Sequence, residues 1–137
     1  MGNEYRERLQ DVHPELRWRV ERILDALAAL NHPAWVAEGI RSAKRQDDLY
    51  AQGRTTPGMI VTNVRSTSPG ATHCPQADGF GHAVDLAFQS GEGLPLDNWS
   101  SAHPWMLLGA MARTLGLTWG GDWRTMKGDY GHVEWKG

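Results

Sequence analysis

The sequence is poor in cysteine and lacks any long apolar run. Cys74 is the only cysteine in 137 residues, which excludes an internal disulfide. The cysteine content therefore does not indicate the redox compartment. No stretch approaches the roughly 18 apolar residues of a membrane span, and the first residues contain no apolar signal-peptide core. We therefore expect a protein made in the cytoplasm, with no export signal of its own and no membrane insertion.

Charge of one sign is not concentrated anywhere in the chain. The formal net charge is -2 and the pI is near 6.3, while Lys and Arg are scattered rather than clustered. A phosphate-binding surface needs a basic stripe, so nucleic acid is not an expected partner. Internal repeats, low-complexity tracts and linkers are also absent from the sequence. We expect one domain over residues 1–137, and a monomer as the default.

Three segments have helical patterns. Apolar residues recur at helical spacing in Pro14–Leu30, and Pro14 suits a first helical turn. The same spacing in His103–Leu115 stops at Gly116. Ser42 is a suitable cap for a helix over about Ala43–Gln52. These patterns predict three helices.

Strand patterns are shorter. His82–Phe88 alternates with the period of a half-buried strand, and Asp85 falls on the face opposite to the core. The residues from Arg54 to about Gly81 are irregular, and a loop of that length in a compact domain is usually functional. Short strands are expected at Trp35–Glu38, His82–Phe88, Leu117–Trp119 and, at the C-terminal edge, His132–Trp135. The irregular order of elements favours an α+β fold with helices packed on a small antiparallel sheet.

Two histidines and an aspartate form a candidate metal site. His73, Asp85 and His132 are a three-ligand set for a catalytic zinc, which keeps its fourth position for water and lowers the pKa of that water toward about 7. Asp129 lies three residues before His132, where its carboxylate can reach that water as a general base. Glu134 shares a strand face with His132 and is expected to fix the imidazole tautomer. The sequence thus predicts a zinc hydrolase.

Other side chains compete for these roles. His82 lies three residues before Asp85, but alternation along a strand places the two on opposite faces. His13, His32 and His103 each precede a proline at a helix start or in a connector, where a capping role suffices. Cys74 is a soft alternative ligand, although a small buried residue is its more ordinary role.

Short motifs follow one another in a particular order along the chain. They are Gly39–Ser42, Gln46, Leu49–Tyr50, Gly53–Gly58, Val61–Asn63, Gly81–Leu86, Trp119–Trp123 and Asp129–Glu134. In this order they resemble the zinc metallopeptidases that include D-alanyl-D-alanine carboxypeptidases, dipeptidases and phage endolysins that cut L-alanyl-D-glutamate bonds. Leu9–Leu16 is also similar to the endolysin branch, so the resemblance covers nearly the whole chain.

The resemblance implies a hedgehog-like, D,D-peptidase-like fold with zinc at the positions of His73, Asp85 and His132. It matches Asp129 to the catalytic carboxylate, and Arg41 to the arginine that contacts the substrate or the developing oxyanion. In endolysins that carboxylate is commonly Asp, as it is here.

The chain departs from the family pattern around the first ligand. The family's first histidine usually lies seven residues before the aspartate, which is Asp78 here, whereas His73 lies twelve residues before Asp85. An insertion of about five residues within Cys74–Phe80 would reconcile the two. Ala71 also stands where the family prefers Ser. Because an Asp-Asp-His set suits zinc less well, His73 is the expected ligand, with His82 and Asp78 as alternatives.

The resemblance implies a phage-type endolysin that hydrolyses the L-alanyl-D-glutamate bond of peptidoglycan stem peptides during host lysis. Such an enzyme reaches the wall, in the periplasm, after the membrane is permeabilised, and no separate wall-binding domain is expected. The alternatives are a D-alanyl-D-alanine carboxypeptidase of wall metabolism and an inactive zinc-stabilised binding domain. The exact bond and the host's wall chemotype are outside what the sequence determines.

Overall fold

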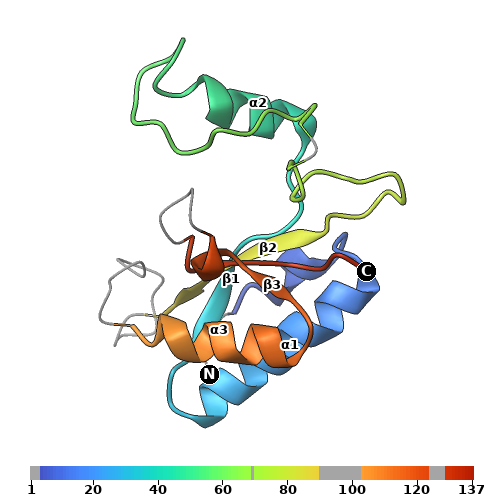
Figure 1. Cartoon of the computed structure of the whole chain (residues 1–137), viewed down its shortest axis with the longest axis vertical. Coiled ribbons are helices and arrows are strands. Elements are labelled where there is room, and N and C mark those ends of the chain that lie inside the picture. The colour runs from blue at the N-terminus through green and yellow to red at the C-terminus, as the bar shows by residue number, and fades with distance from the viewer. Residues whose placement is uncertain (1–3, 69, 90–102, 124–128) are drawn as a thin grey trace.

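The computed structural model describes residues 4–68, 70–89, 103–123 and 129–137 (Figure 1). It contains helices and strands in the mixed order that the sequence predicts, so the α+β prediction is confirmed. The elements are η1 (Arg6–Leu9), α1 (Pro14–Ala29), β1 (Ala34–Glu38), α2 (Ala43–Ala51), β2 (Ala83–Phe88), α3 (Trp105–Thr114), β3 (Thr118–Trp119), η2 (Gly120–Asp122) and β4 (His132–Glu134).

The four strands form one antiparallel sheet in the order β1-β2-β4-β3. The expectation that the last strand lies at an edge is wrong, because β4 pairs with both β2 and β3. The register sets Asp85 opposite His132 on one side and opposite Glu38 on the other. Backbone pairing thus brings together side chains that are far apart in the sequence.

The central strand β2 is covered on both faces, which corrects the prediction of a half-buried strand. Val84, Leu86 and Phe88 enter the core as expected, but Ala83 and Ala87 on the opposite face are also fully buried. A strand paired on both edges leaves little backbone exposed, and its small alanines are easily covered. Asp85 is the most exposed position of the strand.

Helices α1 and α3 pack together and supply much of the core. The His13 side chain accepts a hydrogen bond from the Glu15 N–H and caps α1, with Pro14 in the first turn. Gly109 of α3 lies against Trp119, where an added Cβ would come within 2.5 Å of the ring. The core residues of the two helices are Leu16, Val20, Ile23, Leu24, Leu27, Trp105, Leu108 and Ala112.

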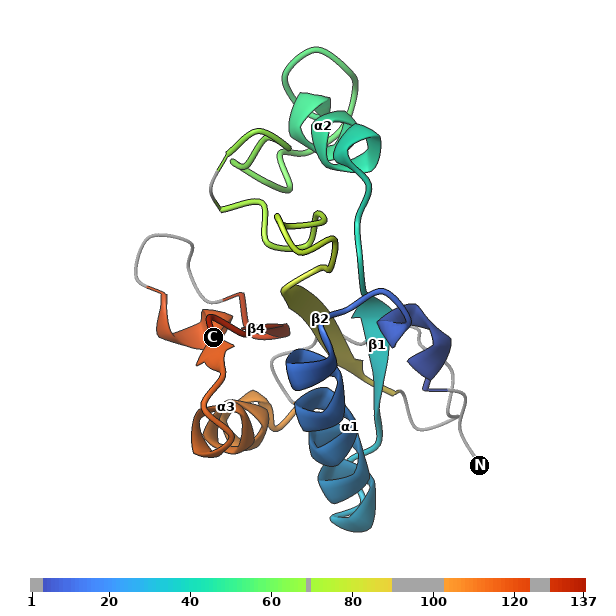
Figure 2. The ribbon, with the colours of Figure 1, turned by 90° about the vertical axis from the view of Figure 1, so that its right-hand side faces the viewer.

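The segment of residues 39–72, which contains α2, lies at the opposite end of the molecule from α1 and α3 (Figures 1 and 2). The Ser42 side chain accepts from the Arg45 N–H and caps α2, as predicted. Between α2 and β2 the described residues form turns and bends but no helix or ladder of strands. In the described part of the chain, none of the helices has the length and apolar character that crossing a membrane requires.

Candidate metal and catalytic site

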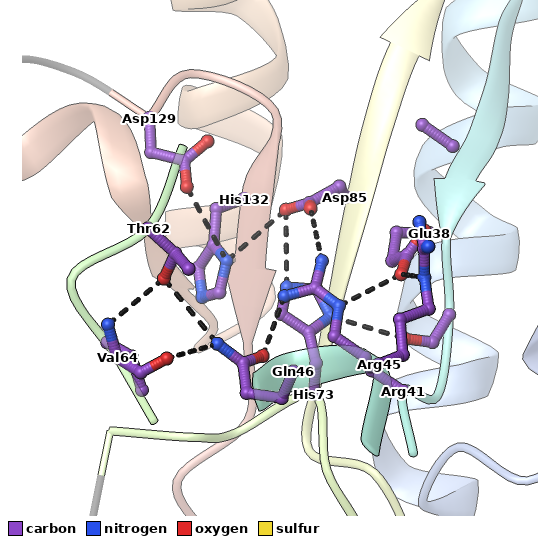
Figure 3. Close-up of polar contacts among 12 residues, drawn as sticks. Glu38, Arg41, Arg45, Gln46, Thr62, Val64, His73, Asp85, Asp129 and His132 are labelled. Carbon is purple, nitrogen blue, oxygen red and sulfur yellow. Dashed lines mark hydrogen bonds and ion pairs between the residues drawn. The ribbon is translucent and has the colours of Figure 1, made fainter. Parts of the chain in front are cut away.

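His73, Asp85 and His132 converge beside the edge of β2 (Figure 3). His73 Nε2 lies 3.4 Å from Asp85 Oδ1, and His132 Nδ1 lies 3.3 Å from the same oxygen. The three potential ligand atoms all lie within 4.8 Å of one another. His73 comes from the long loop, Asp85 from β2 and His132 from β4, so loop and sheet build the cluster together.

Each imidazole is oriented by a partner on its other nitrogen. His73 Nδ1 lies 3.2 Å from the Gly39 carbonyl oxygen, and His132 Nε2 lies 2.7 Å from Glu134 Oε1. Because both partners are acceptors, these nitrogens carry the hydrogens, and the nitrogens facing Asp85 are left free to bind a metal. The hydrogen bond expected between Glu134 and His132 is therefore present.

The donor set fits a divalent metal ion. Asp85 Oδ1 is buried, and it has no hydrogen-bond partner among the described residues although two ring nitrogens face it. Burying a carboxylate oxygen without a partner destabilises the folded protein, unless a cation binds to that oxygen. Two imidazole nitrogens and one carboxylate oxygen are ligands that zinc and related metals accept.

The charged groups of the cluster change one another's pKa values. Burial raises the pKa of Asp85, but the imidazoles of His73 and His132 more than offset this and hold the pKa far below its ordinary value. Burial lowers the pKa of His132, yet its close approach to the Asp85 carboxylate and its hydrogen bond to Glu134 outweigh it and raise the pKa to about 9. The metal-free cluster therefore holds a protonated His132 at neutral pH.

Asp129 lies at the edge of this cluster, with Oδ2 3.9 Å from His132 Nδ1. Burial, followed by the nearby charge of Asp85, raises the pKa of Asp129 above its ordinary value. A carboxylate with a raised pKa binds a proton more readily than an ordinary one, which suits a general base. The predicted convergence of Asp129 and His132 across a turn is present in the structure.

Arg41 joins the site from the other side. Its Nε donates to Glu38 Oε1 at 2.9 Å, and its second terminal nitrogen lies 3.8 Å from Asp85 Oδ2. Burial raises the pKa of Glu38, but hydrogen bonds from Arg45 and Arg41 more than compensate, so its pKa is lowered. A charged Glu38 thus orients Arg41 toward the cluster.

Gln46 is a site residue to which the sequence reasoning gave no role. It is 2% exposed, its Oε1 accepts from Arg41 at 2.8 Å, and its Nε2 donates to the Val64 carbonyl at 2.6 Å. It therefore links Arg41 to the loop on the far side of α2. Its only signal in the sequence is its place in the motif after Ser42.

We expect Gln46→Leu to lower the free energy of unfolding by about 1–3 kcal/mol, because the Val64 carbonyl and the Arg41 guanidinium, both partly buried, each lose a partner. Denaturant unfolding measures this loss. Gln46→Glu keeps an acceptor for Arg41 but removes the donor to Val64, so it separates the two contacts. A Leu variant as stable as the native protein would show that neither contact matters.

These side chains line a cleft with a cavity volume of about 130 Å³. A larger cavity of about 460 Å³ lies between η1 and the end of β1, but it is lined by none of His73, Asp85, Asp129 or His132. The smaller cleft is therefore the candidate active site. Its walls are Arg41, Gln46, Val61, Thr62, Val64, Gly70, Ala71, Thr72, His73, Asp85, Trp123, Asp129 and His132.

The alternative ligands lie elsewhere. His82 Nε2 lies 2.7 Å from Asp78 Oδ2, and the His82 ring packs against His13 and Trp135 rather than in the cluster. The Cys74 thiol is buried, and its nearest acceptor is the Ser42 carbonyl oxygen at 3.9 Å. Neither His82, Asp78 nor Cys74 belongs to the group of ligand atoms that could hold a metal in the described part of the chain.

Residues 76–80, within the segment where an insertion is expected, form a compact turn. The Gly79 N–H donates to the Gln76 carbonyl, and the Gln76 N–H donates to the Phe80 carbonyl, which folds residues 76–80 back on themselves. The Gln76 side chain also donates to the Ala71 and Cys74 carbonyls. These contacts close the turn, and His73 lies beside Asp85 although the two are twelve residues apart in the sequence.

The fold and this cleft define a hydrolase of the metallopeptidase class. A family model described as D-alanyl-D-alanine carboxypeptidase matches residues 78–135. The chain is 35% identical over 130 residues to the peptidoglycan L-alanyl-D-glutamate endopeptidase CwlK of Bacillus subtilis, covering 90% of this chain and 73% of that protein. The solved structure of the Serratia marcescens L-Ala D-Glu endopeptidase ChiX matches with a TM-score of 0.62 and 28% identity, covering 99% of this chain and 89% of the other.

The chain belongs to the metallopeptidase family of the D-alanyl-D-alanine carboxypeptidases and L-alanyl-D-glutamate endopeptidases. It is a peptidase, and the family resemblance read from its motifs is confirmed. The hedgehog-like α+β architecture is confirmed by the structural match along nearly its whole length.

Proposed function

We propose that this protein is a zinc endopeptidase that hydrolyses the L-alanyl-D-glutamate bond of peptidoglycan stem peptides, with His73, Asp85 and His132 as ligands. The convergence of these three side chains with Asp129 and Arg41 in one cleft carries the proposal. The names of CwlK and ChiX support the choice of bond. When bound, zinc supplies a Lewis acid that activates water and polarises the scissile carbonyl.

The chain's own groups supply the proton transfer and the orientation. Asp129, with its raised pKa, accepts the proton of the attacking water and gives it to the leaving amine. Arg41, held by Glu38 and Gln46, presents its remaining N–H groups to the substrate or to the oxyanion that develops on it. Trp123 lines the cleft beside the ligands, with its ring centroid 4.7 Å from that of His132.

We further propose that the enzyme acts as a monomeric phage-type endolysin, with residues 1–137 as one catalytic domain, on the wall of a host whose membrane has been permeabilised. The aspartate at position 129, the form that the resemblance associates with endolysins, supports this role. Adding the protein to host cells with and without a membrane-permeabilising agent tests it. Lysis that depends on the agent is expected, and intact cells in both conditions would contradict the role.

Mass spectrometry of fragments released from purified peptidoglycan tests the bond. The zinc-loaded protein should release fragments with a free D-glutamate amine, and a chelated sample should not. Loss of terminal D-alanine instead would make the enzyme a carboxypeptidase, the activity named for the family model that matches residues 78–135. No release at all would favour an inactive binding domain.

Metal affinity should depend on pH. The pKa of His132 is raised to about 9 in the metal-free protein, and the proton must leave before Nδ1 can bind a metal. We expect affinity to rise by up to about tenfold per pH unit below that value and to level off above it. Competition with a chromophoric chelator at several pH values measures this, with His82→Ala as the control that keeps the slope. An affinity independent of pH between 6.5 and 9 would contradict it.

A further inference from the structure

The loop after α2 exposes large apolar side chains next to one another. Met59, Ile60 and Val61, here called the apolar ridge, are 82%, 56% and 54% exposed. They end a run of nine exposed residues that begins at Gly53. Scattered apolar residues on a surface are ordinary, but a contiguous group of this kind marks an interaction site.

The ridge is fixed in its exposed position by hydrogen bonds. Gln52 Nε2 donates to the Met59 carbonyl at 3.0 Å. The Arg54 guanidinium donates to the carbonyls of Tyr50 and Thr62 at 2.6 and 3.0 Å, and to Asn63 Oδ1 at 2.9 Å. These contacts hold both ends of the loop, so the apolar side chains are presented to solvent by a pre-ordered backbone.

The ridge is continuous with the active-site cleft. Val61 belongs to the ridge and also lines the cleft, together with the following Thr62 and Val64. In Figure 3, Thr62 and Val64 lie beside Gln46, and both line the same cleft as Asp129 and His132. A bound substrate peptide that leaves the cleft past Val61 therefore passes over Ile60 and Met59.

Basic side chains outnumber acidic ones near the ridge. Residues 39–72 contain five basic and two acidic side chains. Arg41 and Arg45 pair with Glu38, which leaves Arg54 and Arg65 as the basic side chains of this segment without an ion pair to a described carboxylate. Both acidic side chains have partners, since Asp48 pairs with Lys44 at 2.7 Å and Asp47 accepts from Ser66 at 2.8 and 2.7 Å.

Two arginines near the ridge form no ion pair with any carboxylate that the structure describes. Arg54 and Arg65 stack on the ring of Tyr50, with Cζ 3.9 and 4.7 Å from its centroid. Neither forms an ion pair with a carboxylate of the described residues. The other contacts of Arg54 are neutral oxygens, those of Tyr50, Thr62 and Asn63, so its guanidinium keeps its positive charge and its attraction for an anion. Hydrogen bonds from Ser66, and then the charge of Arg65, lower the pKa of the Asp47 carboxyl group, so Asp47 offsets part of the positive charge here. The two arginines together still leave a net positive charge beside the apolar ridge.

We propose that the apolar ridge with Arg54 and Arg65 is a wall-binding surface, which holds the peptidoglycan peptide that extends beyond the cleft. This inference rests on the proposed function. Stem peptides carry free carboxylates, which match the arginines, and alanine methyl groups, which match the ridge. The surface would give the catalytic domain a second point of attachment to its insoluble substrate.

An anionic bilayer would also match apolar and basic side chains, but the position of the ridge argues against it. Because Val61 is shared with the cleft, a membrane that buried the ridge would cover the entrance that a polymeric substrate must use. A peptide strand that follows the ridge leaves the cleft occupied and open to the rest of the wall. Continuity with the cleft therefore favours peptidoglycan.

Sedimentation with isolated peptidoglycan sacculi tests the proposal, in an Asp129→Asn background that prevents digestion. Met59→Ser and Arg65→Gln should each weaken binding by about threefold or more, and added salt should abolish the effect of the arginine. Met106→Ser and Arg22→Gln are matched controls, since Met106 is 66% exposed on α3 and Arg22 also stacks on a ring, that of Trp18. The controls should bind like the parent.

A second readout uses the active enzyme. The ratio of its rate on sacculi to its rate on a soluble L-alanyl-D-glutamyl peptide should fall in the Met59 and Arg65 variants and stay at the parental value in the controls. Equal binding by all variants, or binding to phosphatidylglycerol vesicles that Met59→Ser removes while sacculi binding is unchanged, would overturn the wall-binding surface. Failure of the parent protein to cleave the soluble peptide would instead contradict the proposed function, because sedimentation needs no cleavage.

Discussion

Asp129→Asn is expected to lower kcat by about 10²–10⁴-fold while the protein keeps its metal. The amide has nearly the shape of the carboxylate but accepts no proton at neutral pH, so the transfer from water to the leaving amine is lost. His73, Asp85 and His132 remain in place, since the Asp129 carboxylate is 3.9 Å from the nearest ligand nitrogen. Rates on a soluble stem peptide, with metal content measured on the same sample, check both halves of the prediction.

The control for this variant is Asp122→Asn. Asp122 lies seven positions before Asp129 in the sequence, but its carboxylate is exposed and pairs with Arg113 outside the cleft. It should keep the parental rate. An Asp129→Asn enzyme with an unchanged rate, or one that lost metal and activity together, would show that Asp129 is not the base.

Asp85→Asn is expected to weaken metal binding by more than about a hundredfold and to abolish turnover. Asp85 contributes the only carboxylate of the cluster, and its Oδ1 faces both imidazole nitrogens. A neutral amide cannot balance the charge of a divalent cation in this buried position. Metal content after dialysis and calorimetric titration of the metal-free protein measure the loss.

Asp78→Asn is the matched control, because Asp78 forms the equivalent contact with His82 outside the cluster. It should keep metal affinity, and His82→Ala should as well, whereas His73→Ala should lose it. If the Asp78 or His82 variant lost metal and the His73 variant kept it, the first metal ligand would be Asp78 or His82 and not His73.

Much of the fold follows from local patterns. The apolar spacing after Pro14 and the Ser42 cap predict helices close to their observed bounds, because these signals act within one or two turns. The burial of Ala83 and Ala87 was missed, since alternation along one strand carries no information about which strands pair beside it. The inner position of β4 was missed for the same reason.

The sequence by itself determined the chemistry available to this protein: two imidazoles, two carboxylates and an arginine in the motif order of a peptidase family. Only the tertiary structure decided which histidine stands beside Asp85. The closed turn at residues 76–80 and the contact of His73 with the Gly39 carbonyl, 34 residues away, bring His73 to the cluster and leave His82 with Asp78. Such contacts depend on the path of the chain in space, and residue spacing alone does not encode that path.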